Sequence, residues 1–573
     1  MREEWARTKI PAFSFLLFLK GEIMSKFYHF IHKILFWIIG LFVFLFPLFT
    51  LFKMGFEVEG GFGIANFTGI FESPRTLQAI GNTFIIAFGA TAISVAVGFL
   101  YALIVAYTNI RFKRLVELLV ILPYIIPGYV VTLSWTALFA GNSPVNTFLR
   151  ENGLPVINMY SLGGIILVLG ISNAALVYLN IVDILRKVPQ EQEWASRIAG
   201  YRMEETLRNI NFRTVLPAIV SGIILAFLSS IDNFAITATL GSPAGITVLS
   251  TYIYEKAIGF GPASFNQAAV LSIILSLIAF GGIALQWWVL RKSVIMEAAR
   301  PDYEPRILLA KGKRRLVEIL SVTTLVLVNI VPLLVMFLSS LQVGYSRSLF
   351  DSSTMKLDNY RFILETPNMY KGFLTSFGLT VVAILIGILV SVWVMYYKQR
   401  HDQRATLPIE LGAALTYSTP GIVLALSMIF YWSKVPNVYG TMRILLIAYV
   451  TRYILLLLRG SNTALLGVTI ELEEAASVSG SKTFEKWRRI IIPIIKNQIF
   501  SSSFLVFTGA FTELTLSSLL AAADAKTVGL TIFNLQTGGD NNIAQAYSVM
   551  LTLFILAIVL IRNHFERRNR TND

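Results

Sequence analysis

Long apolar stretches, each bounded by polar or charged residues, recur along the whole chain. Most hold about 17–26 residues, and a helix needs roughly 20 apolar residues to cross the hydrocarbon core of a bilayer. The pattern therefore predicts an all-α integral membrane protein with about twelve transmembrane helices. The spans expected in the first half are 34–52, 82–107, 115–139, 163–185, 217–237 and 268–290. Those expected in the second half are 316–339, 376–397, 407–432, 441–458, 494–519 and 544–561.

Basic residues gather after spans two, six, eight and twelve, and they set the expected orientation. Short cytoplasmic loops of membrane proteins carry an excess of Lys and Arg. Both termini and every second loop are therefore expected in the cytoplasm. The residues concerned are Arg111, Lys113 and Arg114, the basic cluster within 291–315, Lys398, Arg400 and Arg404, and Arg562, Arg567, Arg568 and Arg570.

The two halves of the chain repeat each other. Pro127 matches Pro420, 293 residues later, with the same Gly after each. Beyond a longer outer loop in the first half the spacing falls to 280, at which Gly200 matches Gly480. Because each half holds six spans, the halves share one topology and should be related by a pseudo-two-fold axis along the membrane normal.

Domain boundaries follow from the spans and the repeat. We expect an N-terminal cytoplasmic segment (1–33), a first half (34–290), a cytoplasmic linker (291–315), a second half (316–561) and a cytoplasmic tail (562–573). The charge of the linker, with Pro301, Pro305 and Gly312, predicts a solvated connector. Residues 20–24 can be encoded AAA-GGA-GAA-ATT-ATG, a ribosome-binding sequence ahead of a start codon. We therefore expect translation to begin at Met24 and residues 1–23 not to be native.

Two of the expected cytoplasmic loops, after spans four and ten, hold about 30 residues each, more than a turn between antiparallel helices needs. In the first, Pro189 suits the first turn of a short helix and Gly200 its end. In the second, Thr469 is placed to cap the helix and Gly480 to end it. The prolines expected to open the spans that follow are Pro217 and Pro493.

Each short helix, lying parallel to the membrane, would form a rigid knob on the cytoplasmic side. Acidic residues near its start, such as Glu193 in the first loop, suit the positive end of the helix dipole. The small side chains of Ala475 and Ala476 in the second loop permit a partner to approach closely. A rigid knob can pass a partner's motion to the two attached spans. For either loop alone, an ordinary amphipathic surface helix is the alternative.

The second loop reads Glu474-Ala475-Ala476, three further residues, Gly480 and then Pro493. This resembles the EAA loop of the transmembrane subunits of bacterial ABC importers, and the whole chain after residue 34 resembles a fused, two-half permease of the ferric-iron type. The resemblance implies the type I importer permease fold. The first loop departs from the pattern. Its matching residues are Ala195 and Gly200, with Trp194 in place of the motif glutamate and Glu193 as a possible substitute.

The resemblance also implies partners. The EAA loops would dock on a separate ATP-hydrolysing subunit, in two copies, and an extracytoplasmic binding protein would deliver the substrate. The chain itself would bind no cofactor and would be no enzyme, since it holds no G-x-x-x-x-G-K-[ST] sequence for ATP. The location implied is the bacterial cytoplasmic membrane, in contact with lipid. Ferric iron is the substrate implied, while phosphonate, thiamine and polyamine permeases look alike at this level.

Composition narrows the function classes further. Charged residues make up 14% of the chain, against roughly 25% in soluble proteins. The net charge of +15 comes from basic residues beside the spans, which explains it without nucleic acid. The chain has no cysteine, and its four histidines lie outside or at the edges of the spans, so no metal site is expected. The histidines are His29, His32, His401 and His564.

Ionisable residues inside spans are candidates for a substrate path. Asp232 and Asn233 lie late in span five, and Glu513 matches Asn233 at the spacing of 280. Acidic groups there, in the outer half of the membrane, could line an outer gate and favour a cationic or hydrated metal substrate. The alternative is a helix-end carboxylate satisfied by a neighbouring hydroxyl such as Ser230 or Thr512.

Two further features of the spans give structural expectations. Arg452 lies near the inner end of span ten and is expected to snorkel toward the cytoplasm. Pro123, Pro127 and Pro420 are expected to kink spans three and nine.

A secondary transporter with two parallel six-span halves is the alternative from another class. It would need buried carboxylates or histidines as a proton relay. Two acids, Asp232 and Glu513, are too few for a proton relay, and the two long loops would have no function in such a transporter. A membrane enzyme is less favoured still, because we find no nucleophile–base pair and no metal triad.

Overall fold

The computed structural model describes residues 27, 29–58, 61–259, 262–291, 301–344, 349–522 and 525–570. The expected start at Met24, residues 1–23 and the linker residues 292–300 lie outside these ranges. Within them the chain is helical except for turns, isolated bridges and one hairpin, formed by β1 (Glu57–Val58) and β2 (Gly61–Phe62).

Ten helices of the described ranges are long and apolar enough to cross a membrane. They are His29–Phe56, Pro74–Tyr107 (α4), Leu162–Leu185 (α8), Met203–Asp232, Ser264–Leu290 (in α14, Pro262–Leu290), Lys311–Ser340, Pro367–Arg400 (α18), Met442–Leu466 (α21), Thr483–Phe511 and Asn541–Arg562 (in α27, Asn541–Arg570). The other two predicted spans are broken: α5 (Lys113–Ile125) with α6 (Gly128–Leu138), and α19 (Leu407–Ser418) with α20 (Gly421–Trp432). Each predicted span thus has a helical counterpart, which confirms the all-α membrane fold.

The breaks fall at the predicted prolines. Pro127 and Pro420 stand directly before α6 and α20, and the α5–α6 pair is bent by 104°. Ile126 and Thr419, the residues before these prolines, are extended, as the ring of a following proline requires. Pro123, which we also expected to kink span three, lies inside α5.

Spans five and eleven begin earlier than predicted, because Pro217 and Pro493 do not open them. Met203–Asp232 consists of α10 (Met203–Thr206), the π-helix η3 (Leu207–Phe212) and α11 (Arg213–Asp232). The counterpart Thr483–Phe511 consists of α23 (Thr483–Lys486), η5 (Trp487–Ile491) and α24 (Ile492–Phe511). In the second half the wider π turn contains Arg489, four residues before Pro493, and accommodates a residue that lacks an N–H group. In the first half the π turn ends at Phe212, five residues before Pro217.

The first helix of each half packs against the broken span of the other half. His29–Phe56, which contains η2 (Gly40–Leu45) and α2 (Phe46–Phe56), lies against α19 and α20. Lys311–Ser340, made of α15 (Lys311–Leu325), η4 (Val326–Ile330) and α16 (Val331–Ser340), lies against α5 and α6. The largest cluster of buried apolar side chains contains residues of both halves. Two smaller clusters each join one half to the first helix of the other half.

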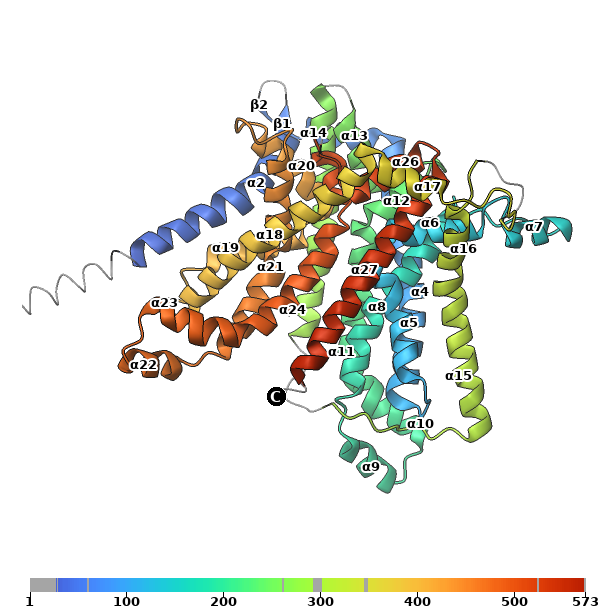
Figure 1. Cartoon of the computed structure of the whole chain (residues 1–573), viewed down its shortest axis with the longest axis horizontal. Coiled ribbons are helices and arrows are strands. Elements are labelled where there is room, and N and C mark those ends of the chain that lie inside the picture. Colours follow the sequence, from blue (N-terminus) through green and yellow to red (C-terminus); the bar gives the residue numbers. More distant parts are fainter. Residues whose placement is uncertain are drawn as a thin grey trace, which may run out of the picture.

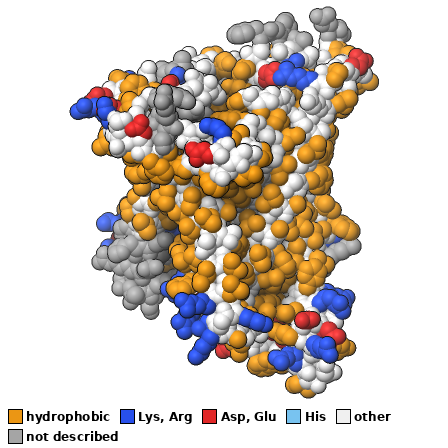
Figure 2. Space-filling view, turned by 90° about the vertical axis from the view of Figure 1, so that its right-hand side faces the viewer, with side chains coloured by type: hydrophobic (Ala, Val, Ile, Leu, Met, Phe, Trp, Pro, Cys, Tyr) orange, Lys and Arg blue, Asp and Glu red, His pale blue; other side chains and the backbone are white. Residues whose placement is uncertain are grey.

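Shorter helices stand at the two ends of the bundle. Figure 1 shows α13 (Leu249–Ile258), α17 (Asp358–Glu365) and α26 (Val528–Thr537) at one end, beside the β hairpin, with α9 (Gln190–Ile198) and α22 (Ile470–Val478) at the other. The remaining short helices are α3 (Ala65–Glu72), α7 (Pro144–Glu151), α12 (Phe234–Gly241) and α25 (Thr515–Leu520). Figure 2 shows a broad apolar band between the ends, with basic side chains concentrated near the end that carries the loops. Exposed apolar side chains of this kind belong against lipid.

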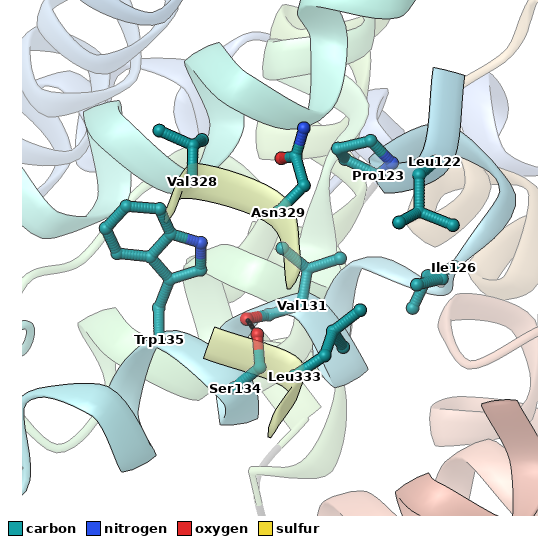
Figure 3. A pocket seen from close by; sticks show the side chains of 9 residues that line it. All are labelled: Leu122, Pro123, Ile126, Val131, Ser134, Trp135, Val328, Asn329 and Leu333. Atoms are coloured by element: carbon teal, nitrogen blue, oxygen red, sulfur yellow. Dashed lines mark hydrogen bonds between the residues drawn. The ribbon is translucent and has the colours of Figure 1, made fainter. Parts of the chain in front are cut away.

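A hydrogen bond between the halves repairs one defect in this packing. Pro123 has no N–H for the carbonyl of Leu119, four residues earlier, and Asn329 of η4 donates its Nδ2 to that carbonyl at 2.8 Å. Asn329 lines a small pocket together with Pro123 and Trp135 (Figure 3). An unpaired carbonyl is costly in a bilayer, so this contact ties the second half to the first.

Replacing Asn329 with Leu should lower the free energy of unfolding in detergent by about 1–3 kcal/mol, because the carbonyl of Leu119 then has no donor. In a Pro123→Ala background the new backbone N–H can bond to that carbonyl, so the same replacement should cost clearly less. Thermal unfolding of the four variants measures the difference. Equal costs in the two backgrounds would show that the hydrogen bond is not the source of the stability.

Candidate functional site

The two long loops have the same structure at a constant spacing. Helices α9 and α22 hold nine residues each. In the second half α22, α23 and η5 each begin 280 residues after their counterparts α9, α10 and η3 in the first half. Both helices lie at the same end of the bundle (Figure 1). The repeat predicted from matched glycines therefore extends to the backbone of both loops.

Both helices end at a glycine in the left-handed region. Gly200 has φ +92° and Gly480 has φ +80°. In each case the glycine N–H bonds to a carbonyl three residues back, and the next N–H bonds to one five residues back, the Schellman arrangement. A Cβ at either glycine would meet no atom within 4 Å, so the need for glycine there is conformational.

The starts of the helices differ in detail from the prediction. Pro189 is the N-cap residue of α9, one position before the helix. Thr469 is the N-cap of α22, but its side chain makes no capping bond. The pKa of the Glu471 carboxyl is lowered by its own backbone N–H and then by the Thr469 hydroxyl. The acid in the first turn therefore bonds to its own N–H, one of the free groups at the helix start.

Exposure along the two helices follows one pattern. Ala195, Glu474 and Ala475 are exposed, whereas Ala476 is buried against the protein. Ile198 and Val478, at matching positions, are 87% and 90% exposed. The motif did not single out these two residues, although an apolar residue at the same place in both polar loops is a signal readable from the sequence. Each knob therefore carries an apolar tip at the end of the molecule where basic side chains gather.

Glu193 is the counterpart of Glu473, so the proposed substitution for Glu474 has the wrong register. Both Glu193 and Glu473 are buried, and Glu474 faces outward. Asn211 donates its Nδ2 to Glu193 at 2.6 Å, and the Arg306 Nε lies 3.3 Å from the same oxygen. Glu473 accepts from the Tyr396 hydroxyl at 2.8 Å and from Arg400 at 2.7 Å. These two glutamates anchor the loop helices rather than extend from them.

Asp232 lies at a contact between the halves. One carboxylate oxygen accepts the backbone N–H of Gly421 at 2.6 Å, and the other lies 3.0 Å from Nη2 of Arg452. Arg452 also donates to the carbonyl of Thr419. The arginine is therefore half-buried in an ion pair and does not snorkel as predicted. The pair closes the α19–α20 break, with the cation at the carbonyl end of α19 and the anion at the N–H end of α20.

Asn233 and Glu513 occupy matching breaks in spans five and eleven. Asn233 accepts the N–H of Ile236 at 2.9 Å, and Glu513 accepts that of Leu516 at 2.9 Å. The Tyr453 hydroxyl donates to the second oxygen of Glu513 at 2.6 Å. Each side chain thus serves the backbone at the break before α12 or α25.

The hydroxyls expected to satisfy these carboxylates bind elsewhere. Ser230 accepts from Asn173 at 3.0 Å, and Thr512 donates to the carbonyl of Thr508 at 2.9 Å. No hydrogen bond or ion pair among the described residues joins Asp232 to Glu513. The pathway role of these residues stays a prediction, and both acids have structural partners.

Comparison with known proteins now places the chain. Residues 94–289 and 384–571 each match the family described as the binding-protein-dependent transport system inner membrane component. The chain belongs to this family. The presence of two matches in one chain confirms the fused, two-half permease predicted from the repeat.

Individual relatives cover most of the chain. It is 22% identical over 491 residues to the ferric transport system permease protein FbpB of Actinobacillus pleuropneumoniae, covering 84% of this chain and 70% of that protein. It is 23% identical over 499 residues to the Fe(3+)-transport system permease protein FbpB 2 of Haemophilus influenzae, covering 86% and 90%. The putative 2-aminoethylphosphonate transport system permease protein PhnU of Salmonella typhimurium is 26% identical over 231 residues, covering 40% and 80%.

Replacing Gly480 with Ala should destabilise the second loop by about 1–2 kcal/mol, because alanine is strained at this positive φ. The measurement is hydrogen exchange of the α22 amides. Gly312→Ala serves as the matched control. Gly312 is the second residue of α15, has open space around it and does not have a positive φ, so the same change should not destabilise that helix. An unchanged exchange rate in the Gly480 variant would contradict the conformational argument.

Replacing Asp232 with Asn should cost about 2 kcal/mol of unfolding free energy in detergent and reduce transport. The value lies between those of exposed and fully buried ion pairs, because the Asp232 side chain is 34% exposed and that of Arg452 16%. Glu365→Gln, which breaks an exposed pair with Arg361, should change stability by less than about 0.5 kcal/mol. A combined Asp232→Asn, Arg452→Met variant should cost less than the two single changes together. If the costs of the two single changes simply add, the two side chains do not stabilise each other.

Proposed function

We propose that this permease is the membrane subunit of an ATP-driven importer and that α9 and α22 dock on two copies of a separate ATPase. The observation that carries this proposal is the pair of equal knobs with exposed apolar tips. An apolar side chain as exposed as Ile198 or Val478, at the end of the molecule away from the apolar band, is best explained by a partner that covers it. Two matching knobs suit two copies of one partner.

The attached spans supply a route for motion from the knobs to the contact between the halves. Gly200 leads from α9 into Met203–Asp232, whose far end carries Asp232. This helix holds 30 residues, which correspond to roughly 45 Å. Thr483–Phe511 follows α22 in the same way and ends two residues before Glu513. A partner that draws the knobs together would thus displace the helix ends at the breaks, and with them the Asp232–Arg452 pair.

We infer that a gate lies at the Asp232–Arg452 pair and the neighbouring helix breaks. This place is on the side of the membrane opposite the knobs. An external binding protein would release substrate there, and the change from outward to inward access would separate or reorder the two halves. Because such a binding protein carries the recognition, the permease needs no dense ligand cluster. The location that fits is a bacterial cytoplasmic membrane, with both termini and both knobs in the cytoplasm.

Ferric iron is the substrate we propose. The support is that the two ferric-iron permeases described above align over most of both halves. The phosphonate relative matches at similar identity but aligns with less than half of the chain. Phosphonate, thiamine and polyamine remain the alternatives that the transport test distinguishes.

A transporter driven by an ion gradient would need carboxylates that take up and release protons during the cycle. Asp232 is held by a guanidinium and a backbone N–H, and Glu513 by a backbone N–H and a tyrosine hydroxyl. Both acids are thus already engaged as structural partners at the helix breaks. This disfavours the alternative class.

Replacing Ile198 and Val478 together with Asp should weaken binding of the ATPase at least about tenfold, because charged groups would enter an apolar contact. Phe112→Asp is the control, since Phe112 is exposed but lies outside both loops. The measurement is co-purification with the ATPase, followed by uptake of labelled ferric iron into vesicles that hold ATP inside and have the binding protein outside.

Two results would overturn the proposal. One is a chain that purifies without any ATPase and moves solute in vesicles under an ion gradient alone. The other is ATPase binding that the double variant and the Phe112 control reduce equally.

A further inference from the structure

The last part of the linker is packed against the first loop. Among its contacts, the N–H of Asp302 bonds to the carbonyl of Arg186 at 2.7 Å. The N–H groups of Arg306 and Ile307 both bond to the carbonyl of Tyr107, the last residue of α4, at 2.8 Å. Farther along the linker, Leu309 and Asn109 exchange two hydrogen bonds: the Leu309 N–H donates to the Asn109 side chain, which donates in turn to the Leu309 carbonyl. The composition of the linker predicted a solvated connector, but this part of it is fixed to the first half.

The purpose of this docking is visible at Arg306, whose side chain is only 3% exposed. Its Nε lies 3.3 Å from the carboxylate of Glu193, and its Nη2 donates to the carbonyl of Val188 at 3.0 Å. It also pairs with Asp302 of the linker at 2.9 Å. One guanidinium thus holds both the loop helix α9 and the residue just ahead of it.

The second half makes the same two contacts with a different arginine. Arg400 donates through Nε to Glu473 at 2.7 Å and through Nη2 to the carbonyl of Val468 at 2.6 Å. Glu473 and Val468 match Glu193 and Val188 at the spacing of 280. The two guanidinium groups therefore occupy equivalent places in the repeat.

The two arginines come from different parts of the chain. Arg400 is the last residue of α18, and its counterpart at the spacing of 293 is Tyr107, at the end of α4. A tyrosine cannot supply the positive charge. Instead the backbone of Tyr107 receives the linker, and the linker brings in Arg306. The charge missing from the first half is thus provided by the connection to the second.

We propose that Arg306 is the positioning residue of the first loop helix and that residues 301–310 of the linker form part of the first docking site. Without the guanidinium, the buried Glu193 would lack its counter-charge, and α9 would lose its fixed orientation. The docking part of this proposal rests on the proposed function; the positioning part does not.

The experiment compares two variants of the full-length chain in detergent, each altered at the arginine that holds one of the two loops. Trypsin reports on each loop separately, because Arg197 and Arg202 in the first loop and Lys482 in the second are exposed. Arg306→Met should speed cleavage of the first loop at least tenfold and leave the second unchanged. Arg400→Met should do the reverse.

The conservative variant separates charge from packing. Arg306→Lys should give intermediate protection, since an ammonium group can reach the Glu193 carboxylate but cannot bridge to the carbonyl of Val188 in the same way. In a Glu193→Gln background, Arg306→Met should cause a much smaller further loss of protection. Equal cleavage of both loops in Arg306→Met, or no change in either, overturns the positioning role. So does a lysine variant as sensitive as the methionine variant.

A second readout separates this inference from the function on which it partly rests. The purified ATPase is bound to each variant, and Arg306→Met should weaken binding roughly tenfold. Loss of protection with normal ATPase binding would overturn the linker as part of a dock while leaving Arg306 as the anchor of α9. Failure of the unaltered chain to bind any ATPase would instead count against the proposed function.

Discussion

The hydrocarbon core of a membrane offers no hydrogen bonds, so each break in a spanning helix must be satisfied by groups of the protein itself. This constraint explains where many of the polar side chains inside the bundle stand. Asp232 and Arg452 close the break before Pro420, and Asn329 serves the carbonyl that Pro123 leaves unpaired. These three polar side chains make the broken spans possible in an apolar surrounding.

The same constraint makes the halves unequal. At the spacing of 280, the positions that match Asp232 and Arg452 hold Thr512 and Ser172, so only one of the two broken spans is closed by a charge pair. That pair joins the halves, since the anion comes from the first and the cation from the second. A change in the contact between the halves therefore alters the interaction of two opposite charges at this one place.

Local chemistry predicted much of this arrangement. The spans, the breaks at Pro127 and Pro420, and the loop helices with their terminal glycines all follow from short sequence patterns. Arg452 was misplaced because its partner lies 220 residues away, and a lone arginine near a helix end is normally a snorkelling one. Glu193 was placed one residue out of register because the motif, and not burial, guided the alignment. No short sequence pattern points to Arg306, because its role becomes apparent only when its contacts are compared with those of Arg400 in the other half.

The linker contact makes the order of the halves part of the architecture. A fused chain of two interchangeable units could exchange its units or arise from a symmetric pair with no loss. Here the segment that joins the units also completes the first of them, through Arg306 on Glu193 and Val188. Two copies of the first half alone would each lack this cation, whereas the second half carries its own at Arg400. The connection is thus directional, because the first half depends on the linker for a cation that the second half supplies for itself.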